Sequence, residues 1–277
     1  MHSSPAPSCL LFPRQREEDG MSSEERSGPS WSRLPAGLAP GDGLSVGMIA
    51  LAPDRVGVRD FEAFLAPVPD VAVFATRVPM ADVVTPDSLA AMREHLAEAA
   101  ARLVPGSPLA AIAFSCTSGT AAIGIEAVRA AIGEARPGVP VHTPIEAGAK
   151  ALEALGARRI ALLAPYLEAT GGLIADYFEA QGIEVLSRAT FALDGDRQMN
   201  RVTPACLIEA GRGCIAATPG AQALFISCTG LATAQVVQSI EDATGLPVVT
   251  SNQALAWDVL RGCGDMTKIE GRGRLFR

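Results

Sequence analysis

The chain has 277 residues, of which 48% are hydrophobic and 19% charged, so it can bury a substantial core in one large or two modest domains. Its formal net charge is -7, and its Lys and Arg residues are scattered. A phosphate backbone would find no basic face, so we expect no nucleic-acid partner. No uninterrupted apolar run approaches the roughly 20 residues that a membrane helix needs, so we expect no membrane partner either.

Residues 1–43 differ in composition from the rest of the chain. They combine Ser, Pro and Gly with charges of both signs and lack sustained apolar periodicity, which is typical of a disordered tail. Met21 is a candidate alternative start. We find no secretory or mitochondrial targeting pattern in this stretch. Six cysteines without paired spacing then indicate free thiols and a cytoplasmic location.

From Ser45 onward, short apolar runs alternate with longer helical patterns. The runs predict strands at residues 46–51, 71–76, 110–114, 139–141, 160–164, 185–189, 223–226 and 248–249. The helical patterns cover residues 90–103, 121–134, 145–155, 173–181, 204–216, 232–244 and 253–261. Strand and helix alternation of this kind predicts an α/β fold with doubly wound parallel sheets, whose ligands bind beyond the carboxyl ends of the strands.

An internal repeat organises this part of the chain. Residues 113–121 read AFSCTSGTA and residues 225–233 read FISCTGLAT, each a buried strand followed by Ser-Cys-Thr. Residues 48–54 and 160–166 repeat as MIALAPD and IALLAPY, and residues 138–144 and 245–251 as GVPVHTP and GLPVVTS. Cys116 and Cys228 are 112 positions apart, and so are Asp54 and Tyr166.

The repeat predicts two similar lobes, 44–157 and 158–277, related by a pseudo-twofold axis with the active site between them. The last helix of the second half is a candidate to pack on the first lobe. In this arrangement the equivalent strand ends converge, so Cys116 and Cys228 enter one cleft from opposite sides. We therefore expect both cysteines to be catalytic.

Two facing thiols suit the inversion of a carbon next to a carboxylate. One group removes the α-proton and the other delivers a proton to the opposite face. We expect each thiol at a helix N-terminus, where the free N–H groups and the dipole shift its pKa from about 8.5 toward neutrality. The hydroxyl and N–H groups that follow are candidates to bind the carboxylate and the enediolate: Thr117, Ser118, Thr229 and Gly230.

These motifs resemble the aspartate/glutamate racemase superfamily. The segments 115–120 (SCTSGT), 227–230 (SCTG), 163–166 (LAPY) and 250–254 (TSNQA) are most similar to its maleate isomerase and arylmalonate decarboxylase branch, and closest to the racemase-like group of bacterial ectoine utilisation. The resemblance covers roughly residue 46 to the end. It implies a cofactor-independent isomerase, a place in ectoine degradation, and assembly into dimers or larger homo-oligomers.

The resemblance also implies roles for particular residues. In racemases the two cysteines are acid and base, whereas in maleate isomerases the first, here Cys116, adds to the double bond and the second, here Cys228, handles the proton. Tyr166 matches a substrate-contacting tyrosine, and Thr117 and Ser118 match carboxylate-binding or oxyanion residues. The decarboxylases have glycine at the first cysteine position, so Cys116 argues against decarboxylation.

One position departs from the maleate isomerases. They carry a Ser-Ser-Asn type sequence after the first strand, whereas this chain has Asp54 there. A carboxylate at Asp54 would repel a dicarboxylate and attract an ammonium group, which favours an amino-acid substrate. Asp54 is also a candidate N-cap or turn residue. Asn252 is a further substrate-binding candidate, with capping of the last helix as the alternative.

The other chemistry-bearing residues form no recognisable motif. Cys206, Cys214 and Cys263 lack the repeat context, and the three histidines, His2, His95 and His142, show no metal-ligand spacing with them, so no metal is predicted. No dinucleotide fingerprint, phosphate loop or Gly-x-Ser-x-Gly elbow is present. Two alternatives to a racemase remain open: a maleate-type cis-trans isomerase that acts through a covalent Cys116 adduct, and a non-catalytic metabolite-binding protein.

Overall fold

The computed structural model describes residues 31–37 and 43–277. Residues 31–37 are exposed and have no regular structure, while the helices and strands all lie in a single compact unit that extends to Arg277. The remainder of the predicted tail, including the alternative start at Met21, lies outside the described residues. Within the described ranges, no helix combines the length and the apolar character needed to cross a bilayer.

Two four-stranded parallel sheets form the framework of the protein. The first has the order β2-β1-β3-β4 and the second the order β6-β5-β7-β8. The strands are β1 (Leu44–Leu51), β2 (Val71–Val78), β3 (Ala111–Phe114), β4 (Val141–His142), β5 (Arg159–Tyr166), β6 (Glu184–Leu193), β7 (Ala223–Ile226) and β8 (Val248–Thr250). The predicted α/β class with two similar parallel-sheet lobes is therefore confirmed, and the identical strand order agrees with a duplication about an approximate twofold axis.

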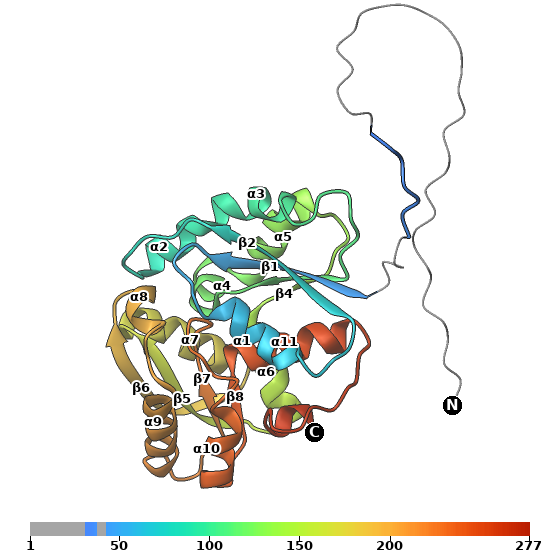
Figure 1. The fold of residues 1–277 in the computed structure, drawn as a ribbon. Coiled ribbons are helices and arrows are strands. Elements are labelled where there is room, and N and C mark those ends of the chain that lie inside the picture. Colours follow the sequence, from blue (N-terminus) through green and yellow to red (C-terminus); the bar gives the residue numbers. More distant parts are fainter. Residues whose placement is uncertain (1–30, 38–42) are drawn as a thin grey trace, which may run out of the picture. The chain divides into compact units, whose positions relative to one another are not determined.

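Helices cover both faces of each sheet. They are α1 (Gly57–Leu65), α2 (Pro86–Ala91), α3 (Leu96–Ala101), α4 (Thr117–Ile123), α5 (Ile125–Ala135), α6 (Pro144–Ala154), α7 (Glu168–Ala180), α8 (Asp196–Met199), α9 (Pro204–Ala216), α10 (Val237–Thr244) and α11 (Ser251–Gly262), with 3-10 turns η1 (Met92–His95) and η2 (Arg274–Phe276). Figure 1 shows α3 and α5 on the outer side of the first sheet, α9 and α10 on the outer side of the second, and α1, α6 and α11 between the sheets. The last long helix, α11, packs on α6, α1 and β3 and so joins the two lobes.

Burial explains why the central strands were visible in the sequence. Every residue of β3 and β7 is buried, and both strands read as continuous apolar runs because helices cover both of their faces. The edge strand β6 instead alternates between exposed and half-buried positions along its whole length. All eight predicted strands are present. The fourth, expected at residues 139–141, is confined to Val141–His142, since Pro140 has no N–H to donate.

The helix predictions needed more correction than the strands. The helix expected over residues 90–103 is divided among α2, η1 and α3, and the one expected over 121–134 begins at Thr117 and breaks at Gly124, whose φ is 90°. The helix expected from residue 232 begins only at Val237. Two helices, α1 and α8, were not predicted. Helix α1 carried a readable signal, because its apolar residues recur at helical spacing and bury Phe61 and Phe64.

Candidate active site

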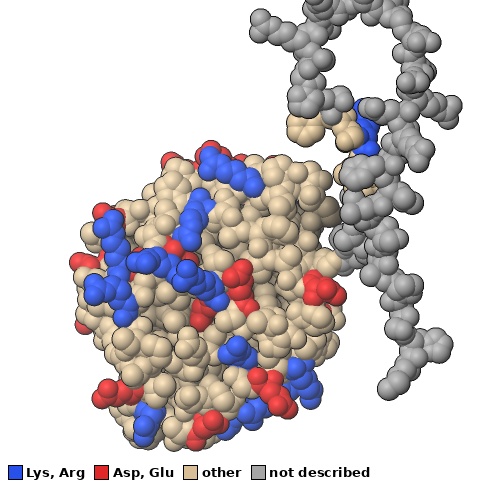
Figure 2. Space-filling model, viewed as in Figure 1, with Lys and Arg blue, Asp and Glu red and all other residues tan. Residues whose placement is uncertain are grey.

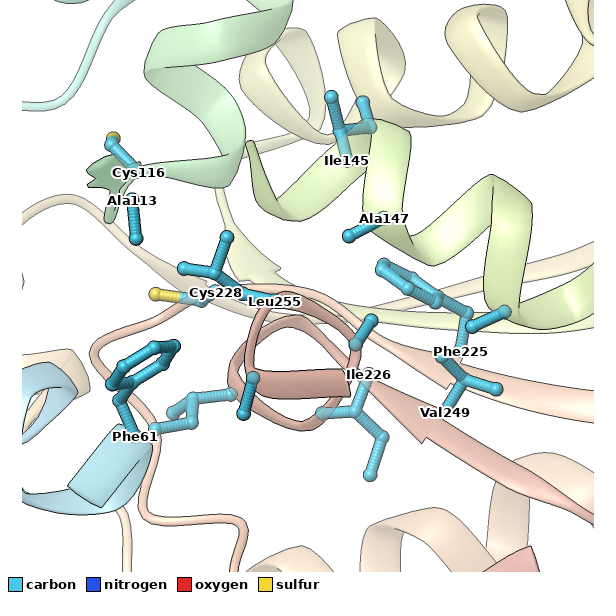
Figure 3. Packing of buried hydrophobic residues seen from close by; sticks show 14 of the residues in the cluster. Phe61, Ala113, Cys116, Ile145, Ala147, Phe225, Ile226, Cys228, Val249 and Leu255 are labelled. Carbon is cyan, nitrogen blue, oxygen red and sulfur yellow. The ribbon is translucent and has the colours of Figure 1, made fainter. Parts of the chain in front are cut away.

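The two Ser-Cys-Thr segments are tied to each other by hydrogen bonds. Thr229 Oγ1 donates to the carbonyl oxygen of Ser115 at 3.0 Å. Ser251 Oγ, at the start of α11, accepts from Thr117 Oγ1 at 2.7 Å and from the backbone N–H of Cys228 at 3.0 Å. The loops after β3 and β7 therefore meet directly. Figure 3 shows the two cysteine side chains in one region, with Cys228 between Cys116 and Phe61 of α1 in that view.

Cys116 is the N-cap of α4, as the sequence predicted for a thiol at a helix N-terminus. Its Sγ accepts the backbone N–H of Gly119 at 3.2 Å, and its side chain is only 3% exposed. A Cβ at position 119 would lie 2.8 Å from this sulfur, so the absence of a side chain at Gly119 lets the thiol sit against the first turn. The Oγ of Ser118 lies 3.9 Å from the same sulfur.

Cys228 differs from its repeat counterpart, and the expectation that it begins a helix is wrong. The chain after it stays irregular until α10 begins at Val237. Cys228 itself has a φ of 97°, a conformation that costs a non-glycine residue about 1–3 kcal/mol and is found mainly at functional sites. Its Sγ accepts the N–H of Gly230 at 3.3 Å and lies 3.9 Å from Met199 Sδ of α8.

A buried carboxylate that the sequence reading missed fixes the loop beyond Cys228. Asp60, on α1, accepts hydrogen bonds from Thr233 N (3.0 Å), Thr233 Oγ1 (2.7 Å), Ala234 N (2.9 Å) and Asn252 Nδ2 (2.9 Å). The Asn252 amide also donates to the carbonyl oxygens of Thr229 at 3.0 Å and Leu231 at 3.3 Å. The contacts of Asn252 thus fix the loop, and Asn252 does not cap α11, because Thr250 does so.

The remaining predicted binding residues lie in the same region, although some of their polar groups are already used. The hydroxyls of Thr117 and Thr229 donate within the linked loops, and the N–H of Gly230 donates to Cys228. Tyr166 ends β5, is 2% exposed, and its hydroxyl lies 3.4 Å from Ser227 Oγ. Burial is the main reason that the Tyr166 pKa lies well above its usual value, so the phenol stays a neutral donor.

Two carboxylates accompany the cysteines, and only one of them was predicted. Asp54 Oδ1 accepts the N–H groups of Val56 at 2.9 Å and Gly57 at 2.8 Å, so it does act at a turn that leads into α1. Asp196, in the first turn of α8, is buried at 7% exposure. It has no counterpart in the sequence repeat, and it reaches the cysteines only because α8 folds over them.

Burial and nearby negative charge hold both thiols in their neutral form. Burial raises the pKa of Cys116 to about 12, with further increases from Asp196 and Asp54 and a partial decrease from the Gly119 hydrogen bond. The pKa of Cys228 also lies well above its usual value because of burial and Asp196, while a hydrogen bond from Tyr166 lowers it. The predicted shift toward neutrality is therefore wrong for this arrangement, because desolvation outweighs the helix N-terminus.

The surface above this region is rich in arginine. Figure 2, read with Figure 1, shows several Lys and Arg side chains gathered over α8 and α1, with acidic side chains among them. The exposed arginines of these two segments and their flanks are Arg55, Arg59, Arg197 and Arg201. Arg197 lies 3.3 Å from Asp82, whereas no ion pair within the described residues involves Arg55, Arg59 or Arg201, so these three side chains can attract small carboxylates.

The other residues considered in the sequence lie elsewhere. Cys206 is exposed, and Cys214 and Cys263 are half-buried; all three are free thiols. His142 is buried, with its Nδ1 2.7 Å from Asp258 Oδ2 of α11. His95 lies in η1, and His2 is outside the described residues. Over residues 31–37 and 43–277, no group of three or more His, Cys, Asp or Glu is arranged to hold a metal ion.

Two like-ordered parallel sheets, with a buried Ser-Cys-Thr segment at the same strand end of each, define a duplicated α/β protein with a two-cysteine site. The chain belongs to the arylmalonate decarboxylase family, whose profile matches residues 65–276. It is 31% identical to arylmalonate decarboxylase of Bordetella bronchiseptica over 140 residues, and 26% identical to maleate isomerase of Geobacillus stearothermophilus over 137 residues. Each alignment covers 50% of this chain, and the chain spans 58% and 54% of these two relatives.

Solved structures match over a longer part of the chain. Nocardia farcinica maleate cis-trans isomerase with a covalently bound succinylcysteine intermediate superimposes with a TM-score of 0.77 at 22% identity, covering 84% of this chain and 98% of that one. A liganded arylmalonate decarboxylase variant, with one cysteine introduced and another removed, gives a TM-score of 0.73 at 28% identity with the same coverage. The isomerase match supports the fold alone, whereas the sequence matches support the family.

Proposed function

We propose that this chain is a cofactor-independent racemase or isomerase of a small carboxylic or amino acid, with Cys116 and Cys228 as its acid and base. One observation carries the proposal. Ser251 Oγ accepts from both Thr117 Oγ1 and Cys228 N, so two buried thiols from different sheets lie beside a single shared contact. Thiols that served only for packing would need neither this shared contact nor the backbone N–H that each sulfur accepts.

The proposed reaction is a proton transfer at the carbon next to the carboxylate. One cysteine, as thiolate, takes the α-proton and becomes a thiol, and the electron pair of the broken C–H bond passes into the carboxylate as an enediolate. The opposite cysteine, as thiol, then protonates the other face of the same carbon and becomes a thiolate. Atoms and charge balance, and the two sulfurs have exchanged roles. The reverse direction uses the same pair.

Backbone hydrogen bonds are available to stabilise each thiolate. Gly119 N–H donates to Cys116 Sγ and Gly230 N–H donates to Cys228 Sγ, so each sulfur has one backbone donor at 3.2 Å and 3.3 Å respectively. Such bonds are stronger to an anion than to a neutral thiol. The neutral Tyr166 hydroxyl adds a donor at Cys228. The backbone N–H of Thr117, whose hydroxyl is used by Ser251, and the hydroxyl of Ser118 remain our candidates for binding the substrate carboxylate.

Covalent catalysis by Cys116 is the alternative enzymatic mechanism. A Nocardia relative of the same fold carries a succinylcysteine intermediate, and by analogy Cys116 would add to the double bond of a maleate-like diacid. The carboxylates of Asp54 and Asp196 beside the thiols oppose the binding of a dianion, and we therefore favour proton transfer. A place in ectoine degradation, a cytoplasmic location and a homo-oligomeric state are further parts of this proposal.

Incubation in heavy water separates these possibilities. Under the proton-transfer mechanism, the unmodified protein should incorporate deuterium at the α-position of its substrate and invert its configuration, as read by mass spectrometry and chiral chromatography. Cys116→Ser and Cys228→Ser should each abolish inversion, since each removes the acid or base on one face. Cys206→Ser is the matched control, because Cys206 is exposed and lies outside the repeat.

Each alternative gives a different result. Covalent isomerisation would leave a mass adduct on Cys116 with maleate and no α-deuterium in saturated acids. A binding protein would retain its ligand in the double serine variant and show no turnover in the unmodified protein. Absence of exchange, inversion and adduct across small amino acids and diacids would refute the proposed enzyme activity.

A further inference from the structure

The carboxylates beside the thiols lack a cationic partner within the protein. Asp54 and Asp196 are 6% and 7% exposed. Among the described residues, no Lys, Arg or His nitrogen lies within ion-pair distance of either one. The guanidinium of Arg77 instead donates to the backbone carbonyl oxygens of Leu51 at 2.7 Å and Asp54 at 2.6 Å. Buried carboxylates without a counter-charge are costly, so a nearby cation would be bound strongly.

A buried hydroxyl without a partner lies next to the same carboxylate. Ser115 Oγ is inaccessible to solvent and has no hydrogen-bond partner in the described structure. A Cβ built on Gly57 would lie 2.7 Å from Asp54 Oδ2 and 3.1 Å from Ser115 Oγ, so both oxygens lie against the same side of Gly57. Asp54 Oδ1 is held by two backbone N–H groups, which leaves Oδ2 as the oxygen that faces Ser115. Ser115 directly precedes Cys116.

The second carboxylate completes the arrangement from the other lobe. Helix α8, which begins at Asp196, lies against both the second cysteine and the Asp54 turn: Met199 Sδ is 3.9 Å from Cys228 Sγ, and Asn200 Oδ1 accepts the backbone N–H of Arg55 at 2.9 Å. In keeping with this placement, the charge of Asp54 raises the pKa of Asp196, and the charge of Asp196 raises the pKa of both cysteines. A cation among them would offset the repulsion between the carboxylates and would also favour the thiolate form of the cysteines. A dicarboxylate without an ammonium group would add to the repulsion between the carboxylates and would favour the neutral thiol form of the cysteines.

We propose that Asp54 and Asp196, with the hydroxyl of Ser115, bind the α-ammonium group of the substrate and thereby select α-amino acids over the same acids without that group. This inference rests on the proposed function, because it assigns the substrate class of the same two-cysteine site. It also gives the ammonium group a second effect. By bringing a positive charge to the thiols, a zwitterionic substrate promotes the thiolate that removes its own α-proton.

Matched ligand pairs that differ only in the α-ammonium group provide the test. The probes are alanine and propionate, aspartate and succinate, and 2,4-diaminobutyrate and 4-aminobutyrate, with both enantiomers of each amino acid, titrated calorimetrically into the full chain. At least one amino acid should bind ten-fold or more tightly than its partner acid. Asp54→Asn and Asp196→Asn should each reduce that preference at least ten-fold, and Ser115→Ala several-fold.

A control variant and the affinities of the partner acids separate loss of an ammonium site from general damage to the protein. Asp194→Asn, two residues before Asp196 and exposed, should leave the preference unchanged. The partner acids should bind the two Asp→Asn variants as well as or better than the unmodified protein, which general damage to the site would not produce. The inference is overturned if the partner acids bind the unmodified protein equally or more tightly, or if no amino acid in the panel binds.

Failure of this inference can be told apart from failure of the proposed function. Deuterium exchange in succinate or propionate, without any gain from an ammonium group, would keep the proton-transfer reaction and reject the ammonium site. Tight amino-acid binding that depends on Asp54 and Asp196, with no exchange or inversion, would keep the ammonium site and reject the reaction.

Discussion

Replacing Asp196 with Asn should change how the stability of the protein depends on pH. Burial, and then the charge of Asp54, raise the Asp196 pKa from 3.8 to about 6. The folded state therefore holds this proton more tightly than the unfolded chain does. Well below pH 3.8 both states are protonated and folding carries no penalty from Asp196. As the pH rises through about 6, the folded state must bury a charge, and about 3 kcal/mol of stability is lost, at about 1.4 kcal/mol per pKa unit.

The difference in unfolding free energy between the unmodified chain and Asp196→Asn isolates the cost of burying the Asp196 charge. Urea unfolding of the unmodified chain and of Asp196→Asn, repeated from pH 4 to pH 8, should show the variant gaining up to about 3 kcal/mol relative to the unmodified chain across that range. For an ordered region of this size, thermal unfolding should show a relative gain of about 6–12 °C. Asp194→Asn should run parallel to the unmodified protein. A difference between Asp196→Asn and the unmodified chain that stays flat from pH 4 to pH 8 would refute the burial argument.

Two further substitutions, Gly57→Ala and Asp60→Ala, each with a control variant, test the contacts around the site. Gly57→Ala places a Cβ 2.7 Å from Asp54 Oδ2 and 3.1 Å from Ser115 Oγ, so we expect a loss of about 1–3 kcal/mol in urea unfolding and a weakened amino-acid affinity. Gly133→Ala, in α5 with open space around it, should instead be neutral or stabilising by up to about 1 kcal/mol; equal effects of the two would contradict the packing argument. Asp60→Ala removes the acceptor of four buried hydrogen bonds, and leaving those donors unpaired should destabilise the chain by about 3–5 kcal/mol. Glu62→Ala, exposed on the same helix, should stay within about 0.5 kcal/mol of the unmodified protein, and a similarly small effect at Asp60 would show that its network contributes little.

The sequence by itself determined the strands, their parallel arrangement and the pairing of the two halves. Central strands such as β3 and β7 are buried on both faces, so their residues are apolar whatever packs on them, and a local pattern suffices to detect them. The repeat then determined which residues correspond, and Cys116 and Cys228 followed from it. Helix α1 was detectable in principle, because its apolar spacing is local information.

Only the tertiary structure decided the electrostatic character of the site. The burial that holds both thiols neutral is the sum of contacts from many elements, and no residue near Cys116 in the sequence encodes it. Asp196 approaches the cysteines because α8 folds over them, and Asp60 reaches Thr233 across 173 positions. The backbone of Cys228 adopts a positive φ because those distant contacts hold the loop. Local sequence patterns report which faces are buried, whereas charge and strain depend on which distant groups come to share a small, dry volume.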